Sequence, residues 1–183
     1  MKAIRMFLCC GLIISFGCKT SKQNDAVKIA DKKNDAKAET GLISQDVADF
    51  LVQAADARMM DYKEGVLAVQ KGTTKEIKNY GKLMMKDQAA LLTKIKKLAA
   101  DRKISLPADL SGEKKDGYED LAGKEGKEFD EKFCKMMKID HERDVKQFTK
   151  ATELMDDHVR GFAASSLPVI QSHLDKIKAI KVE

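Results

Sequence analysis

Two histidines and one aspartate have the residue types and the spacing that could bind a metal ion. His141 and Asp144 are three residues apart, so their side chains share one face of a helix. His173 could approach the same ion from a second helix. Two imidazoles, one carboxylate and a water would suit Zn²⁺ or Cu²⁺. The sequence therefore indicates a candidate divalent-metal site made of His141, Asp144 and His173.

The same region also suits a polar cluster in a helical core that binds nothing. In that arrangement His141 would bond Gln88, and Asp87 or Asp140 would orient the imidazole ring. Buried polar pairs of this kind set the register of helices more than they add stability. The sequence leaves both alternatives open for one set of candidate residues: Asp87, Gln88, Asp140, His141, Asp144 and His173.

No complete catalytic pattern accompanies these residues. Di-iron centres in helical bundles use Glu-x-x-His pairs, and no Glu-x-x-His occurs in the chain. Gly-x-Ser-x-Gly and Gly-rich phosphate loops are also absent from the sequence. Cys134 is most simply a small buried hydrophobic residue. We therefore expect a protein that is not an enzyme and has no cofactor other than the divalent metal considered above.

Four long helices are predicted to position the candidate residues. Apolar residues recur every three or four positions over roughly 44–71, 73–105, 127–155 and 157–181. The segment between the second and third of these is polar and rich in glycine, with one short helix expected around 114–121. Two helical hairpins joined by this longer crossing segment indicate an all-α fold, an antiparallel four-helix bundle.

The first hairpin is predicted to turn at Gly72, because helix ends often need a residue with left-handed backbone geometry. Thr73 and Glu76 then have the spacing of a capping box for the second helix. The inner stripe of the first helix is predicted to be apolar, with residues in steps of three and four: Ala48, Leu51, Ala55, Met59, Tyr62, Val66 and Val69.

Composition favours helices and argues against nucleic-acid binding. The chain has 183 residues, of which 5% are aromatic, with no Trp and 2 Pro. β-Sandwiches and barrels use more aromatic residues and more turn signals than this. The net charge of +5 is modest and spread along the chain, so no nucleic-acid partner is expected.

The N-terminal residues predict a secreted, lipid-anchored protein. Lys2 and Arg5 precede an apolar run that is too short to span a bilayer, and residues 1–17 fit a signal peptide. Ser15-Phe16-Gly17-Cys18 resembles a bacterial lipobox, in which the Cys is diacylated and becomes the new N-terminus. The alternative is an ordinary secretory signal with a chance Cys. We expect Cys18 to carry lipid and to anchor the protein in the cell envelope.

Residues 18–43 are predicted to form a disordered tether behind this anchor. The segment is rich in Lys and other polar residues, and it has too few sizeable apolar residues to offset the entropy cost of ordering. The folded domain is therefore expected to span 44–183.

Four sequence words in the helical region resemble a known family. In chain order they are AADARMMDYKEGVLA, IKNYGKLMMKDQ, FDEKFCKMMKIDHERDVKQF and GFAASSLPVIQSHL, within about residues 46–181. They are similar to domain-of-unknown-function family 4142, whose members are labelled outer-membrane proteins and grouped with ferritin-like helical bundles. The resemblance implies a ferritin-like bundle and an outer-membrane location facing the periplasm.

The motifs of that family match in two places and differ in a third. Asp140-His141 and Leu167-Pro168 followed by His173-Leu174 are present, whereas Gln88 stands where the family commonly has His. The family has no established activity. We therefore expect a non-catalytic binding, structural or stress-related module that meets the membrane through its lipid, with an envelope protein or a second copy as further partner. The alternative is a ferritin-like protein that binds Zn, Cu or Fe, with degenerate oxidoreductase ancestry.

Overall fold

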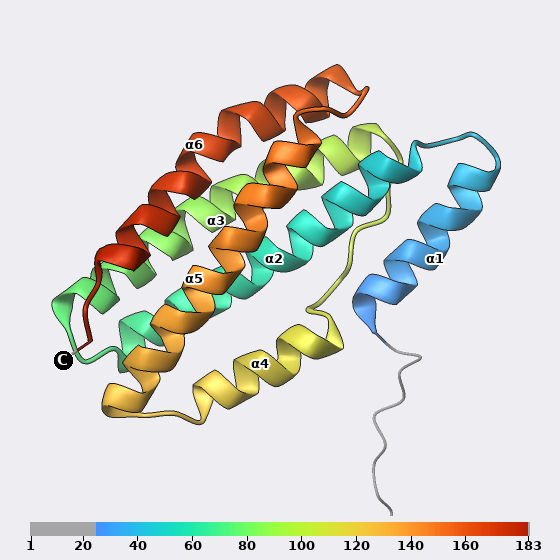
Figure 1. Ribbon diagram of the computed structural model, residues 1–183. Coiled ribbons are helices and arrows are strands. Elements are labelled where there is room, and N and C mark those ends of the chain that lie inside the picture. The colour runs from blue at the N-terminus through green and yellow to red at the C-terminus, as the bar shows by residue number, and fades with distance from the viewer. Residues whose placement is uncertain (1–24, 183) are drawn as a thin grey trace, which may run out of the picture.

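The computed structural model describes residues 25–182 and contains six helices in that range (Figure 1). No strand occurs among these residues, so the all-α prediction is confirmed. The predicted signal peptide and Cys18 lie outside the described residues. The helices are α1 (Ala26–Glu39), α2 (Gln45–Lys71), α3 (Lys75–Asp101), α4 (Gly112–Ala122), α5 (Gly126–Ala151) and α6 (Asp157–Ala179).

The four long helices, α2, α3, α5 and α6, lie alongside one another (Figure 1). The largest contacts join α2 to α3 and α5 to α6, and each of these pairs is an antiparallel hairpin (Figure 1). α2 also packs on α5, and α3 on α6. The crossing segment 102–125 returns along the molecule, so α3 and α5 run in the same direction (Figure 1). The two predicted hairpins and their longer connection are present.

Residues 26–39 form a helix, so the expectation of a disordered tether over 18–43 is wrong in this part. Asp25 caps α1 by accepting hydrogen bonds from two backbone N–H groups of its first turn. The buried side chain of Asn34 donates to the carbonyl oxygen of Ser105 at 2.9 Å and accepts from its N–H at 2.8 Å. α1 also packs on α2. Contacts distant in sequence therefore stabilise a helix whose own composition is polar.

The turn between α2 and α3 differs in detail from its prediction. Gly72 has φ −52° and ψ 135°, so it is extended and not left-handed. The position still suits Gly, because a Cβ atom there would lie 2.6 Å from a backbone oxygen of α2. Thr74, one residue later than predicted, caps α3 through its hydroxyl oxygen. Thr73 instead donates its N–H and hydroxyl to Asp130 of α5 and thereby joins the two hairpins.

The short helix expected around 114–121 is confirmed as α4, which packs against α2 and α5. Its N-cap is Ser111, whose side-chain oxygen accepts from a backbone N–H of the first turn. Ser111 also donates its N–H and its hydroxyl to the buried carboxylate of Asp56 on α2, both at 2.9 Å. The beginning of α4 is therefore fixed to α2.

Two apolar clusters occupy the core, and buried polar side chains separate them. On α2, residues 47–55 contribute to the first cluster and residues 67–68 to the second. Arg58, Asp61 and Glu64 are buried between these two stretches. The other three long helices show the same order, apolar, polar, apolar, along their inner faces.

The inner stripe of α2 departs from its prediction after Ala55. Tyr62 is 38% exposed, whereas the fully buried Arg58 and Glu64 face the core with Asp61. The predicted stripe followed the apolar residues and therefore drifted away from the true inner face. The core at this level is polar, so hydrophobic periodicity could not identify it.

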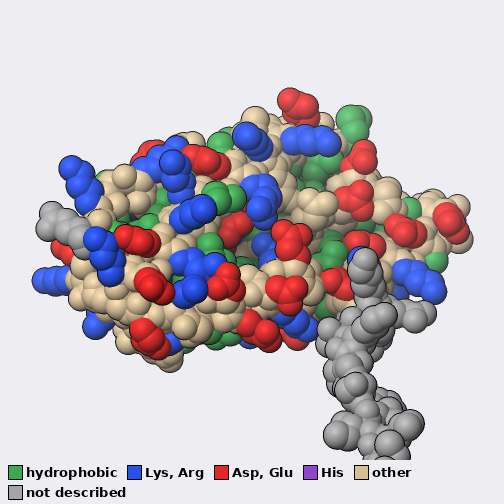
Figure 2. Space-filling model, turned by 60° about the horizontal axis from the view of Figure 1, so that its bottom comes forward, with side chains coloured by type: hydrophobic (Ala, Val, Ile, Leu, Met, Phe, Trp, Pro, Cys, Tyr) green, Lys and Arg blue, Asp and Glu red, His purple; other side chains and the backbone are tan. Residues whose placement is uncertain are grey.

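The surface carries mixed charge. On the face seen in Figure 2, Lys and Arg side chains alternate with Asp and Glu side chains, and neither sign gathers into a single patch. Among residues 25–182, no helix combines the length and the apolar composition needed to cross a membrane.

Candidate functional site

The candidate site is the polar layer, which we define as the buried polar side chains between the two apolar clusters. All four long helices contribute to it. Its members are Arg58, Asp61 and Glu64 on α2, Gln88 on α3, His141 and Asp144 on α5, and His173 on α6.

His141 and His173 meet inside this layer, as the sequence predicted. Their ring centroids are 5.5 Å apart and the rings are nearly perpendicular. Both residues are at most 1% exposed. Tyr80 of α3 packs edge-on against the ring of His141 and donates its hydroxyl to the carbonyl oxygen of His173 at 3.2 Å. The two imidazoles are therefore held against each other by neighbouring side chains.

Each imidazole has one nitrogen engaged and one nitrogen free among the described residues. Nδ1 of His141 lies 2.9 Å from the carbonyl oxygen of Met137, and Nε2 of His173 lies 2.9 Å from the carboxylate of Asp87. Because a carbonyl or carboxylate oxygen only accepts, these ring nitrogens carry the hydrogens. Nε2 of His141 and Nδ1 of His173 are then bare acceptors, buried and without a hydrogen-bond partner among these residues.

Burial keeps both histidines neutral at neutral pH. It lowers the pKa of His141, more than the nearby Asp144 carboxylate raises it. It also lowers the pKa of His173 to about 4, against the opposite effect of its hydrogen bond with Asp87. A neutral imidazole with a lone pair on a buried nitrogen is the form that binds metal ions.

Asp144 lies in the layer but faces a different partner from the one predicted. Its carboxylate accepts a hydrogen bond from Nη2 of Arg58, which is completely buried. The same nitrogen lies 3.2 Å from the carboxylate of Asp61. The guanidinium also lies over the ring of Phe148. Asp144 therefore neutralises Arg58 and is not free to serve as the third ligand of a histidine site.

The hydrogen bonds in the layer also differ from those expected for a polar core cluster that binds nothing. The differences are at Gln88, Asp87 and Asp140. Gln88 donates to the sulfur of Met84 at 3.6 Å, not to His141, and its Oε1 has no partner among the described residues. Asp87 orients His173 and not His141. Asp140 lies 3.2 Å from Arg143 on the same helix. The predicted residues do gather, but in other pairs than the sequence suggested.

Sequence reasoning missed the contribution of α2. Arg58, Asp61 and Glu64 follow one another at steps of three, which places them on one face of the helix. This spacing can be read from the sequence. Because these ionisable residues follow directly after the apolar Ala54 and Ala55, it could have indicated a buried cluster of charges. Burial raises the pKa of Asp61 to about 6 and the pKa of Glu64 well above its usual value.

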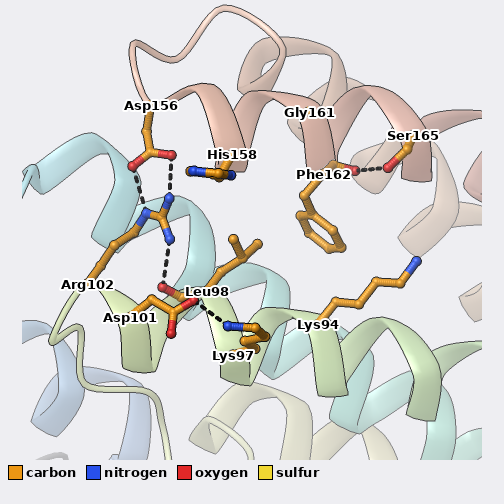
Figure 3. A pocket seen from close by; sticks show the side chains of 10 residues that line it. All are labelled: Lys94, Lys97, Leu98, Asp101, Arg102, Asp156, His158, Gly161, Phe162 and Ser165. Carbon is orange, nitrogen blue, oxygen red and sulfur yellow. Dashed lines mark hydrogen bonds and ion pairs between the residues drawn. The ribbon is translucent and has the colours of Figure 1, made fainter.

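A separate groove of about 670 Å³ lies between the C-terminal end of α3 and the beginning of α6 (Figure 3). His158 lines it and is exposed, so it takes no part in the polar layer. Arg102 and Asp156 form a two-fold hydrogen-bonded ion pair at its edge, with both distances 2.6 Å. This pair joins the end of α3 to the N-cap of α6 at the edge of the groove.

Comparisons with known proteins identify one family and no individual relative. No curated protein and no solved structure matches the chain. One family model matches residues 32–180, which include most of α1 and all five later helices. The matched family is described as a domain of unknown function, DUF4142, and the chain belongs to it.

Proposed function

We propose that this chain is a lipid-anchored protein of the bacterial cell envelope whose helical domain binds a divalent transition-metal ion without catalysing a reaction. In this proposal α2, α3, α5 and α6 form a ferritin-like four-helix bundle. The parallel course of α3 and α5, with a long crossing segment between two hairpins, supports that assignment (Figure 1). The membrane contact is through lipid on Cys18, at an outer membrane facing the periplasm, and no nucleic-acid partner is proposed.

The pair of bare, buried imidazole nitrogens carries the metal proposal. A buried polar atom without a hydrogen-bond partner lowers the stability of the fold by roughly 1–3 kcal/mol. Nε2 of His141 and Nδ1 of His173 are both such atoms. Metal-binding histidines usually donate their other ring N–H to a carbonyl or carboxylate, as these two do to Met137 and Asp87. The residues therefore fit a metal ion.

The donor set favours zinc or copper over harder cations. Two neutral imidazoles suit Zn²⁺ and Cu²⁺, and the buried Oε1 of Gln88 is a further acceptor in the same layer. Iron in a di-iron centre would require Glu-x-x-His pairs, which the sequence lacks. The proposed role is therefore metal binding without catalysis. Asp87 and the Met137 carbonyl orient the two histidine ligands.

Zinc content tests this proposal directly. Purified protein is incubated with Zn²⁺, desalted and analysed by elemental mass spectrometry. We expect about one Zn²⁺ per chain, and its loss in His141→Ala and in His173→Ala. His158→Ala is the matched control, because His158 is exposed and should leave the zinc content unchanged. Circular dichroism shows whether each variant is folded. A folded wild-type protein that retains no zinc would refute the metal function.

A structural role is the second candidate, and the buried ion pair between Arg58 and Asp144 favours it. This pair crosses from α2 to α5 and fixes the two hairpins against each other. If that role is the whole function, the wild-type protein retains no metal and His141→Ala only lowers the melting temperature, because it removes a buried ring and leaves a cavity.

A further inference from the structure

Three carboxylates form a second cluster, and two of them belong to the polar layer. Asp61 and Glu64 come from α2 and Asp140 comes from α5. Each side chain has one carboxylate oxygen that lies within 4.8 Å of a carboxylate oxygen of the other two. The two α2 residues are three positions apart and therefore share a face. No histidine belongs to this group, so the cluster is distinct from the histidine pair.

Glu64 is the member that points to a missing partner. Its side chain is fully buried, and neither carboxylate oxygen has a hydrogen-bond partner among residues 25–182. Its oxygen is aimed into the cluster, as its distance to the other two carboxylates shows. A buried carboxylate without donors is very costly while it is ionised. It must therefore hold either a proton or a cation.

Buried cations are too few to neutralise the cluster. Arg58 lies 3.2 Å from Asp61, but it also forms an ion pair with Asp144. Arg143 lies 3.2 Å from Asp140, but its own side chain is 57% exposed. Glu64 has no ion pair at all among the described residues, so its negative charge has no partner when the side chain is ionised. A divalent cation would correct that imbalance.

A cavity open to solvent lies beside Asp140, one member of this cluster. Its volume is about 190 Å³, and its lining comes from α2, α4 and α5. Asp140 lines it, and so does Lys114 of α4. One water takes up about 30 Å³ of liquid volume, so the cavity can hold several waters beside an ion. Hard cations such as Mg²⁺ and Mn²⁺ need this arrangement, because they keep part of their water shell.

We propose that Asp61, Glu64 and Asp140 bind a hard divalent cation of the Mg²⁺ or Mn²⁺ class, with waters in the cavity completing its coordination. Carboxylate oxygens are the ligands that these ions prefer. Lys114 acts on all three carboxylates as a competing positive charge.

Mn²⁺ binding tests the site, followed by the fall of the free Mn²⁺ signal in electron paramagnetic resonance. We expect the wild-type protein to bind about one Mn²⁺ and Glu64→Gln to lose it. Asp56→Asn is the matched control, because Asp56 is also a buried aspartate of α2 but is bonded by Ser111. Lys114→Gln changes a lysine at the cavity and should bind Mn²⁺ severalfold more tightly, even if Glu64→Gln fails to fold.

The same measurement on His141→Ala separates this proposal from the zinc site. We expect that variant to keep its Mn²⁺ while losing zinc, because His141 is not among the three ligands. The proposal is overturned if the folded wild-type protein binds no Mn²⁺ at millimolar concentration. It is also overturned if Mn²⁺ binding is unchanged in Glu64→Gln and Lys114→Gln, or if it depends on His141 and not on Glu64.

Discussion

Arg58 is the residue on which the charge balance of the polar layer depends. Its guanidinium is fully buried, donates to Asp144 and lies 3.2 Å from Asp61. Removing one partner of a buried pair leaves uncompensated charge and typically costs about 3–5 kcal/mol. We expect Arg58→Ala to lower the free energy of unfolding by about that amount, measured by urea denaturation at pH 7.

Arg143→Ala is the control for this prediction. Arg143 also contacts an aspartate, Asp140, at 3.2 Å, but it is largely exposed. Exposed ion pairs contribute about 0–1 kcal/mol, so the loss should be no larger than that. Equal losses in the two variants would contradict the importance of the buried pair.

Glu64 makes stability depend on pH in a defined direction. Burial raises its pKa well above the usual value, so the folded state holds its proton more tightly than the unfolded chain does. The stabilisation is complete below the unfolded pKa and is lost as pH rises through the folded pKa. Glu64→Gln cannot ionise. Its stability relative to the wild type should therefore increase from pH 5 to pH 8, by up to about 1.4 kcal/mol for each pKa unit of elevation that lies within that range.

This comparison requires urea denaturation with a chelator present, so that no cation occupies the carboxylates. Glu113→Gln serves as the control, because Glu113 is exposed on α4. Its stability relative to the wild type should be the same at pH 5 and pH 8. A pH-independent difference for Glu64→Gln would show that Glu64 is not held as a buried acid.

At this scale the sequence predicted the histidines but not the charges that surround them. His141 and His173 could be placed on inner stripes because apolar neighbours such as Met137 and Ile170 mark those faces. Arg58, Asp61 and Glu64 could not be placed in this way, since charged residues on a helix normally face water. Which carboxylate takes which partner depends on distances between helices, and periodicity holds no such information.

At the scale of elements, two glycines allow α2 and α3 to approach closely. A Cβ atom on Gly81 would lie 2.6 Å from the carbonyl oxygen of Gly65 and 2.8 Å from the Cβ of Ala68. These neighbours are backbone or backbone-linked atoms, so the helices would have to separate. We expect Gly81→Ala to destabilise the protein by about 1–3 kcal/mol in urea denaturation, although alanine favours helices.

Gly161→Ala is the matched control on α6, because nothing lies within 4 Å of a Cβ atom at that position. With no neighbour to displace, the substitution should stabilise the protein by up to about 1 kcal/mol, through helix propensity and a less flexible unfolded chain. Opposite signs for the two glycine variants are therefore the expected result. The same sign would mean that the contact between α2 and α3 can relax without cost.

Helix positions could be predicted well wherever apolar residues recur, and poorly where tertiary contacts decide. The hairpin α5–α6 and the short helix α4 begin and end within a few residues of their predicted limits. α1 was not predicted because the larger of its two buried residues is polar. This residue, Asn34, is hydrogen-bonded to Ser105 on a loop distant in sequence. A pattern of apolar residues cannot reveal such a contact.

At the scale of the whole molecule, the proposed lipid anchor and the proposed metal sites should be separable. Cys18 precedes the described residues, and the polar layer lies within α2, α3, α5 and α6. Two acyl chains bind a membrane far more strongly than one, so diacylated Cys18 would hold the protein there. We expect Cys18→Ser to abolish globomycin-sensitive processing and to move the protein from the membrane to the soluble fraction.

Cys10→Ser is the control, because Cys10 lies within the predicted leader and should not carry lipid. That variant should remain in the membrane fraction. Soluble Cys18→Ser protein should still bind zinc and Mn²⁺ as the wild type does, since neither ligand set includes the N-terminal segment. If Cys18→Ser stays in the membrane, the lipid anchor is wrong while the metal sites stand. If it becomes soluble and loses both metals, ion binding depends on the membrane, and the helical domain alone does not account for it.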